Sequence, residues 1–306
     1  MDVFSIATSG QPKETKQKLP YHLVFLSIPV ESQCTFRIVG EPIVMVRRWI
    51  AQDPETKQWV PVWGYNPNDK RVRRPIILAV KRGNKWIGDH RNDPISRVIA
   101  QMQLPDEVKE QALRPDFLTL FPVFDVSRVV RQVAEDGSVT LVYPNVNGSF
   151  PQAIARHAEL RNEPAILEFR GVPRIRDGVA IGEAAIDKLY QLFLSLVETD
   201  PLTGNAQQLD ITNYLIVMKR VRGEGGKPLT HFLAQRPQSL PEITSYYDLT
   251  TWPTPVNHDA LQQLLDGTLS YSDMLTASNI ELLPRLVTVG QNEQHEQAAE
   301  EELFDD

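Results

Sequence analysis

The sequence predicts a mainly β protein of the α+β class that carries helical decorations and a disordered acidic C-terminal tail. The first observation is that short runs of β-branched and aromatic residues alternate with turn sequences over much of the chain. The second is that only a few stretches space their apolar residues as a helix does, every three to four positions. The third is that residues 286–306 are rich in Glu, Gln and Asp and offer almost nothing to bury.

Composition divides the 306 residues into three parts. Residues 1–20 form a flexible polar and basic arm that contains Lys13, Lys16 and Lys18. We expect residues 21–285 to fold as a single core, because 42% of the chain is apolar. Residues 286–306 are the expected tail.

The first part of the core, residues 21–92, has the pattern of strands joined by turns. Asp53-Pro54-Glu55-Thr56 has a proline preset for a bend, and Gly83-Asn84 suits a tight hairpin. The expected strands are Ile43–Ile50, Trp59–Tyr65, Ile76–Arg82 and Lys85–Ile87.

Helices and further strands follow. Asp93-Pro94 suits the N-cap and first position of a helix, and Asp106–Leu113 predicts another. Val179–Val197 carries the clearest apolar stripe, and Asp259–Leu265 predicts a short helix near the end. The further strands expected are Phe117–Val133, Val139–Tyr143, Ala165–Arg170, Ile211–Val221 and Leu229–Ala234.

The charge is distributed unevenly along the chain. The formal net charge is -7, yet residues 237–306 alone carry thirteen acids and one base. Residues 1–236 are therefore basic, with 31 Lys and Arg against 26 acids. A basic body joined to an acidic end indicates a nucleic-acid partner.

Aromatic residues gather in the most basic segment. From Arg47 to Arg91 there are eleven Lys and Arg against four acids, and four of the five tryptophans lie there. Cationic groups bind phosphates, and flat aromatic rings stack on unpaired bases. This combination is typical of proteins that bind single-stranded nucleic acid.

Strand alternation arranges the aromatic residues. Trp59, Trp63 and Tyr65 share one face of the predicted strand, and Val60 and Val62 share the other. We expect the valines to face the core and the aromatic row to face a bound strand. The alternative is that the large rings face inward, as tryptophans usually do.

Lys70, Arg71, Arg73 and Arg74 lie in a loop between two basic strands. We expect this loop to cover a bound backbone and contact phosphates; the alternative is an ordinary solvated loop. The full set of candidate nucleic-acid-binding residues is Arg47, Arg48, Trp49, Trp59, Trp63, Tyr65, Lys70, Arg71, Arg73, Arg74, Lys81, Arg82, Lys85, Trp86 and Arg91.

The tail suits a docking peptide. An aromatic side chain can fill a partner's pocket while neighbouring carboxylates meet a basic rim. The same charges can compete with DNA for the groove, or simply improve solubility. The candidate docking residues are Glu300, Glu301, Glu302, Leu303, Phe304, Asp305 and Asp306.

Other classes of protein lack a signature here. Cys34 is the only cysteine and the six histidines are scattered, so we expect no zinc site and no other cofactor. We find no membrane-spanning run, no signal peptide and no Walker, zincin or nucleophile-elbow motif. We therefore expect a cytoplasmic protein that is not an enzyme and does not enter a membrane.

A series of short motifs in the second half has a recognisable order. The series is Asp200-Pro201-Leu202-Thr203-Gly204, Leu209-Asp210-Ile211-Thr212, Lys219-Arg220 and Thr230-His231-Phe232. Over residues 40–240 it resembles the phage helix-destabilising proteins, the T-even type of single-stranded-DNA-binding protein. The resemblance implies an OB-type β-barrel core with a DNA groove, cooperative coating of single strands, and tail contacts with replication and recombination proteins. Many members hold zinc, and this chain lacks the ligands for it.

We predict a sequence-independent single-stranded-DNA-binding protein that coats and protects single strands in phage DNA replication, recombination and repair, in the host cytoplasm. It would be a monomer in solution, with cooperativity on DNA left open. One alternative is an RNA-binding or transcription-associated adapter, since composition does not register the 2′-hydroxyl. Another is a metal-dependent nuclease, because Pro115-Asp116 and Glu168-Phe169-Arg170 loosely echo a nuclease metal site.

Overall fold

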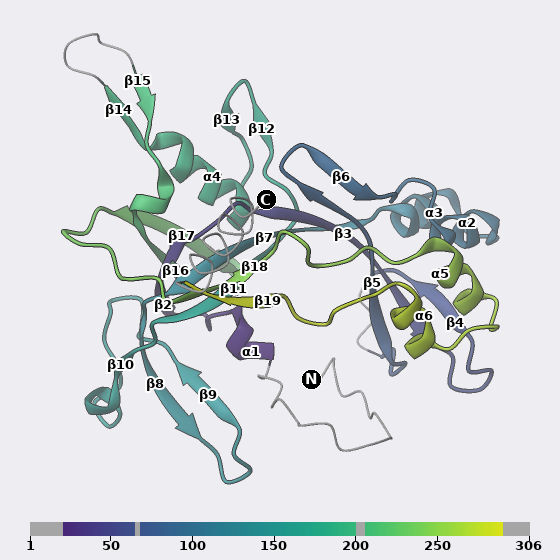
Figure 1. The fold of residues 1–306 in the computed structure, drawn as a ribbon, viewed down its shortest axis with the longest axis horizontal. Coiled ribbons are helices and arrows are strands. Elements are labelled where there is room, and N and C mark those ends of the chain that lie inside the picture. The colour runs from purple at the N-terminus through teal and green to yellow at the C-terminus, as the bar shows by residue number, and fades with distance from the viewer. Residues whose placement is uncertain (1–20, 65–67, 200–205, 290–306) are drawn as a thin grey trace, which may run out of the picture. The chain divides into compact units, whose positions relative to one another are not determined.

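The chain forms two compact units in the computed structural model, which describes residues 21–64, 68–199 and 206–289. Unit 1 contains Val44–Leu118 and Thr251–Leu283. Unit 2 contains Val24–Ile43 and Thr119–Thr250, together with the chain from Pro284 onward. Figure 1 labels the elements of both units, and each unit is described by itself.

The prediction of a mainly β protein is confirmed, with 39% strand and 21% helix. The strands form several antiparallel sheets, and in the described residues they do not close into a barrel. The sequence predicts one core over residues 21–285, whereas in the structure each unit has a hydrophobic cluster of its own. No helix in the described ranges is long and apolar enough to cross a membrane.

The sheet of unit 1 consists of strands that the turn residues delimit. The carboxylate of Asp53 accepts hydrogen bonds from the backbone N–H of Glu55 and Thr56 at 2.9 and 2.8 Å, which closes the first turn as predicted. Gly83 takes a positive φ of 55° in the second turn. In spatial order the strands are β4 (Trp59–Val62), β3 (Ile43–Gln52), β5 (Arg73–Arg82) and β6 (Lys85–Gly88).

Helices of unit 1 pack on this sheet. Asp93 caps the first of them, accepting from the N–H of Ser96 at 2.9 Å, and Pro94 follows at the first helical position as predicted. The cluster beneath them contains Ile50 and Leu78 from the sheet. The helices are α2 (Pro94–Gln101), α3 (Asp106–Leu113), α5 (His258–Leu265) and α6 (Tyr271–Ala277).

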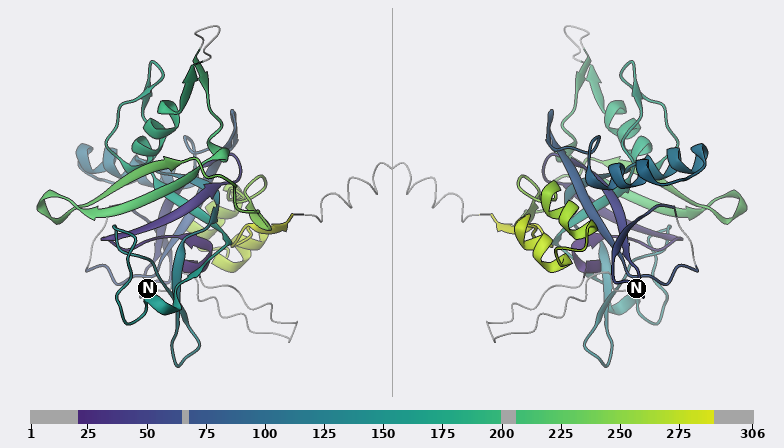
Figure 2. Two further views of the ribbon diagram at one scale, coloured as in Figure 1. Left: turned by 90° about the vertical axis from the view of Figure 1, so that its left-hand side faces the viewer. Right: turned by 90° about the vertical axis from the view of Figure 1, so that its right-hand side faces the viewer.

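Unit 2 is built on a larger antiparallel arrangement, which begins after α1 (Tyr21–Val24). The spatial order is β17 (Pro228–Gln235), β16 (Leu215–Arg222), β2 (Ser32–Ile38) and β7 (Asp116–Asp125), with β11 (Glu163–Arg170) pairing with β7 and, in parallel, with β1 (Phe25–Leu26). The β16–β17 hairpin, green in Figure 2, projects beyond the strands next to it.

Smaller elements complete unit 2. A three-stranded sheet has the order β10 (Glu159–Leu160), β8 (Arg128–Val133) and β9 (Val139–Val142). The two-stranded pairs are β12 (Ile175–Arg176) with β13 (Val179–Ala180), β14 (Val197–Thr199) with β15 (Ala206–Gln208), and β18 (Ser245–Asp248) with β19 (Arg285–Thr288). Short 3₁₀ turns are η1 (Ala155–His157), η2 (Ile211–Asn213) and η3 (Glu224–Gly226).

Four predicted boundaries in unit 2 are wrong. The expected strand Phe117–Val133 is divided into β7 and β8, and the strand expected from Ile211 begins at Leu215 as β16. The helix expected from Val179 begins later, as α4 (Ala185–Ser195), because Val179 and Ala180 form β13 and the Asp187 carboxylate accepts from the N–H of Ala184 at 3.1 Å at the start of the helix. The sequence predicts that the tail begins at residue 286, but residues 286–288 belong to β19, which pairs with β18. Residues 290–306 lie outside the described residues.

A buried polar network lies beside the core of unit 2. Arg161 and Asp125 are both fully buried and form an ion pair at 2.8 Å, and the Tyr143 hydroxyl donates to the same carboxylate at 2.8 Å. Burial, followed by the charge of Asp125, raises the pKa of Tyr143. The hydroxyl therefore stays protonated and keeps donating, so the network is satisfied internally.

Candidate nucleic-acid interface

The β5–β6 hairpin of unit 1 presents cations and an aromatic ring together. The register places Lys81 directly opposite Trp86, so the two side chains share a face. Trp86 is 39% exposed, which is unusual for so large an apolar side chain. Lys85 and Arg91 are exposed as well, and within the described residues none of the three cations forms an ion pair.

Two further aromatic rings stand behind Trp86. The ring centroids of Trp86 and His90 are 5.0 Å apart, and those of His90 and Phe117 are 6.0 Å apart, edge to face. Burial, and then the charge of Arg91, lowers the pKa of His90. His90 is therefore a neutral ring at neutral pH, and it holds Trp86 in place without adding charge. We call Lys81, Lys85, Trp86, His90 and Arg91 the Trp86 surface.

Arg47 and Trp49 form a second, less accessible pair. The Arg47 guanidinium lies 4.9 Å from the centre of the Trp49 ring, and its Nε donates to Asp116 at 2.9 Å. Both side chains are half-buried. They share a face as the alternation predicts, but a phosphate at Arg47 would compete with Asp116.

The prediction that Arg48 binds phosphate is wrong. Arg48 is buried, and its guanidinium donates to the carbonyl oxygens of Ala112 and Leu113 and to the Ser96 hydroxyl. Its Nε lies 3.6 Å from a carboxylate oxygen of the fully buried Asp93. The guanidinium thus joins β3 to the ends of α2 and α3, on the helical side of the strand.

The predicted orientation of the aromatic row is also wrong. Trp59 stacks on Tyr271 of α6 with 5.1 Å between ring centroids, and both Trp59 and Trp63 pack against the hydrophobic cluster of unit 1. On the other face Val62 is buried, as expected, and Val60 is half-buried. Helices cover the face that carries the tryptophans. The alternation of side chains along a strand shows which residues share a face, but not which face a helix will cover. Tyr65 lies outside the described residues.

The basic loop is organised by an acid. Asp69 accepts two hydrogen bonds from the Arg71 guanidinium, at 2.9 and 2.8 Å, and one from Arg73 at 2.9 Å. These bonds hold the pKa of Asp69 well below its usual range, so the carboxylate stays charged. Arg71 and Arg73 are thus already paired, while Lys70 is exposed.

The remaining predicted cations lie against the last part of unit 1. The Arg74 guanidinium is 6.0 Å from the centre of the Tyr271 ring. Arg82 donates to the carbonyl oxygen of Pro253 at 2.9 Å. Both side chains are half-buried and link β5 to the segment that follows Thr250, so each contributes to packing.

Sequence reasoning missed His90 and Phe117. His90 lies four positions after Trp86, which is a weak signal, whereas Phe117 is brought in by β7 and has none. Of the nuclease-like residues, Asp116 is bonded to Arg47. In the described part of the chain no group of three or more His, Cys, Asp or Glu side chains could hold a metal ion. The tail residues Glu300–Asp306 lie outside it.

The motifs that carry the family resemblance are partly described. Asp210 caps the turn at η2, accepting from the N–H of Thr212 at 2.9 Å. Lys219 and His231 lie opposite each other on β16 and β17. In comparisons with known proteins, no family model, no curated protein and no solved structure matches this chain.

Proposed function

We propose that this protein binds single-stranded nucleic acid through the Trp86 surface, with single-stranded DNA as the preferred ligand. The observation that carries the proposal is the exposed Trp86 ring, flanked by Lys81, Lys85 and Arg91, none of which is paired with an acid in the described residues. A base can stack on the ring while the cations contact the phosphates on either side. Such binding is largely independent of sequence, because every base has a π face.

The wider setting belongs to the same proposal. The motif resemblance supports a protein that coats and protects single strands during phage DNA replication, recombination and repair in the host cytoplasm. An OB-type arrangement, which is a partly open barrel, would fit that role. The acidic tail would compete with DNA and dock replication or recombination proteins, and the protein would act as a monomer.

The decisive experiment compares two triple variants that remove the same charge. Replacing Lys81, Lys85 and Arg91 by Ala should flatten the plot of log affinity for poly-dT against log salt by about 2, at about 0.7 per lost contact. Replacing Lys70, Arg71 and Arg73 by Ala should change the slope by less than about 0.7, because Arg71 and Arg73 are already paired with Asp69 and only Lys70 is available to a phosphate. Equal effects would assign the binding to general charge and not to the Trp86 surface.

A fluorescence titration of the intact chain shows which kind of nucleic acid it binds. The tryptophan emission of the chain should fall on adding a single strand and barely change on adding a duplex, whose bases are not accessible for stacking. Matched DNA and RNA oligomers decide between the DNA-binding protein and the RNA-binding adapter. An equal response to single strands and duplex would overturn the stacking mechanism.

A further inference from the structure

Unit 2 contains a cavity of about 640 Å³ that none of the sequence motifs points to. It is lined by residues 33–35 of β2, residues 124–128 around the start of β8, residues 144–148, residues 160–162 at the end of β10, Leu215 of β16 and residues 241–244. Its volume is in the range of small-molecule sites in proteins. The cavity opens to solvent, since Arg128, Leu160, Asn162 and Glu242 at its edge are all exposed.

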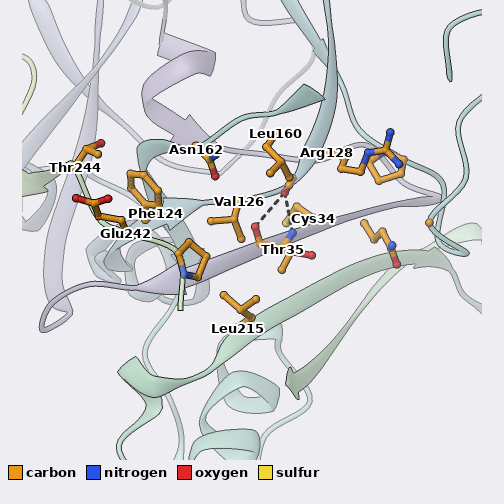
Figure 3. Close-up of a pocket in the computed structure, with 15 residues that line it drawn as sticks. Cys34, Thr35, Phe124, Val126, Arg128, Leu160, Asn162, Leu215, Glu242 and Thr244 are labelled. Carbon is orange, nitrogen blue, oxygen red and sulfur yellow. Dashed lines mark hydrogen bonds between the residues drawn. The ribbon is translucent and has the colours of Figure 1, made fainter. Parts of the chain in front are cut away.

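The lining is divided into apolar sides and polar ends. Figure 3 shows Leu160 and Leu215 on opposite sides of the cavity, with Val126 between them. The same view places Arg128 at one end, Glu242 beside Thr244 at the other, and Asn162 between Leu160 and Glu242. A flat ring fits between two apolar side chains, and its polar edge then meets the groups at the ends.

These polar side chains have unused hydrogen-bonding capacity. Arg128, Asn162 and Glu242 form no side-chain hydrogen bond or ion pair with any other described residue, and the same holds for the side chain of Gln33. By contrast, the Ser127 hydroxyl in the lining is engaged: it accepts from the N–H of Thr35 at 2.8 Å and donates to its carbonyl at 3.2 Å. The available groups are one guanidinium, two amides and one carboxylate.

The rim is held in place by bonds outside the cavity. Arg37 donates to the carbonyl of Pro241 at 3.3 Å, and the N–H of Val289 donates to the carbonyl of Thr244 at 2.9 Å, so Glu242 is fixed from both sides. Asn162 follows Arg161, which is anchored in the buried network with Asp125. A site whose groups are already ordered loses less entropy on binding.

We propose that this cavity binds one nucleotide of the single strand, with its base between Leu160 and Leu215 and its phosphate on Arg128. The inference rests on the proposed function and adds a second contact site to it. Arg128 and Glu242 fix the direction, because the carboxylate repels the phosphate and accepts a hydrogen bond from an exocyclic amino group. The amides of Gln33 and Asn162 donate and accept, as base edges do. The site therefore prefers the bases with an exocyclic amino group (adenine, cytosine and guanine) to thymine.

The test maps oligomers of dA, dC and dT onto the full-length chain by NMR and measures their affinities. The side-chain amide signals of Gln33 and Asn162 should shift with dA and dC oligomers, and less with dT. Arg128→Ala should flatten the salt slope by about 0.7. Arg176→Ala, which removes an exposed guanidinium elsewhere in unit 2, should not. Glu242→Gln should reduce the preference for dA and dC over dT about tenfold, since the amide can also donate to thymine.

The outcomes separate the two proposals. Two results would show that the cavity does not bind the strand and would leave the Trp86 surface as the one proposed contact site. In the first, the oligomers bind but the amide signals of Gln33 and Asn162 do not shift. In the second, Arg128→Ala and Arg176→Ala change the salt slope by the same amount. If no oligomer binds, both proposals fail. Shifts caused only by free 5′-dAMP or 5′-dCMP would identify a mononucleotide site and would overturn the assignment to a strand.

Discussion

Arg47 and Arg48 are neighbours in the sequence and have opposite surroundings. Arg47 lies over Trp49 and pairs with the half-exposed Asp116, whereas Arg48 is buried against Asp93 and the ends of two helices. One peptide bond separates a cation that solvent can reach from one that it cannot, because adjacent strand residues point to opposite faces. At the scale of single residues, the surroundings and not the residue type decide which cations are available to a ligand.

Arg48→Met should lower the free energy of unfolding by about 3–5 kcal/mol, because it leaves the buried Asp93 carboxylate without its cation. Chemical denaturation measures the loss, and Arg47→Met, at a half-exposed site, is the matched control with a much smaller effect. The salt dependence of DNA binding should be unchanged for Arg48→Met where the variant is folded. A flattened slope would return Arg48 to the set of phosphate contacts.

His90 should titrate below the ordinary histidine pKa. Its folded-state pKa is lowered by burial and by Arg91, so the fold favours the neutral ring. The stability contributed by His90 is fully present above the unfolded value of about 6.5 and is lost as the pH falls toward the lower folded value. NMR of the imidazole gives the midpoint directly, and protonation should also quench Trp86 emission.

A bound strand changes this titration in a defined direction. Phosphates near the Trp86 surface favour the imidazolium, so adding poly-dT should raise the midpoint of His90. A midpoint that the strand leaves in place would show that no phosphate lies near His90. A midpoint above about 6.5 in the free protein would mean that the ring is not buried as described.

Elements combine residues that the chain keeps apart. The β5–β6 hairpin aligns Lys81 with Trp86 by register, and the loop before β5 pairs Arg71 and Arg73 with Asp69 by its turn geometry. Both segments are basic in sequence, yet in the described residues Lys81 and Lys85 of the hairpin form no ion pair, whereas Arg71 and Arg73 are both paired with Asp69. Local backbone structure therefore decides which of two basic segments has cations available for a ligand and which has its arginines already paired with an acid.

Gly182→Ala should destabilise the junction of β13 and α4. A Cβ at Gly182 would lie 1.7 Å from a carboxylate oxygen of Asp187, which is fully buried and accepts from the N–H of Arg174 and Ala184 at 2.7 and 3.1 Å. Displacing that carboxylate leaves both N–H groups unpaired, at a cost on the order of 3 kcal/mol. The midpoint of urea unfolding measures it. Glu183→Ala, at the exposed neighbouring residue, is the control that should leave the midpoint unchanged.

The whole molecule is divided by charge. Residues 1–236 have a formal charge of +5, and residues 237–306 have -12. Much of the negative charge lies in the last 15 residues, which contain seven acids and no Lys or Arg. A polyanion tethered to a basic surface has a high effective concentration there, so under the proposed function the acidic tail would compete with DNA for that surface.

Truncation after Gly290 should tighten binding to poly-dT, most clearly at low salt, where screening is weakest. Phe304→Ala should leave the affinity for DNA unchanged, because it removes no charge, and should abolish capture of replication or recombination proteins. Equal affinities of the truncated and intact chains at low salt would exclude competition by the tail. Retention of the same partners by Phe304→Ala would exclude docking through the aromatic ring.

Patterns of near neighbours were predictable from the sequence. The β5–β6 hairpin, the Asp93 cap of α2 and the span of α3 follow from turn residues, capping chemistry and apolar spacing, all of which act over a few positions. The clustering of cations and tryptophans before residue 92 is likewise a property of the chain itself. Short-range physics therefore determined most elements and the segment that carries the candidate interface.

Only the tertiary structure decided which face of each strand is covered. Alternation places Trp59 and Trp63 on one face, but α6 comes from a segment about 200 residues later and turns that face into core. The same long-range packing buries Arg48, brings Phe117 to His90 and assembles the cavity of unit 2 from six separated segments. Burial depends on partners distant in sequence, and no local pattern encodes them.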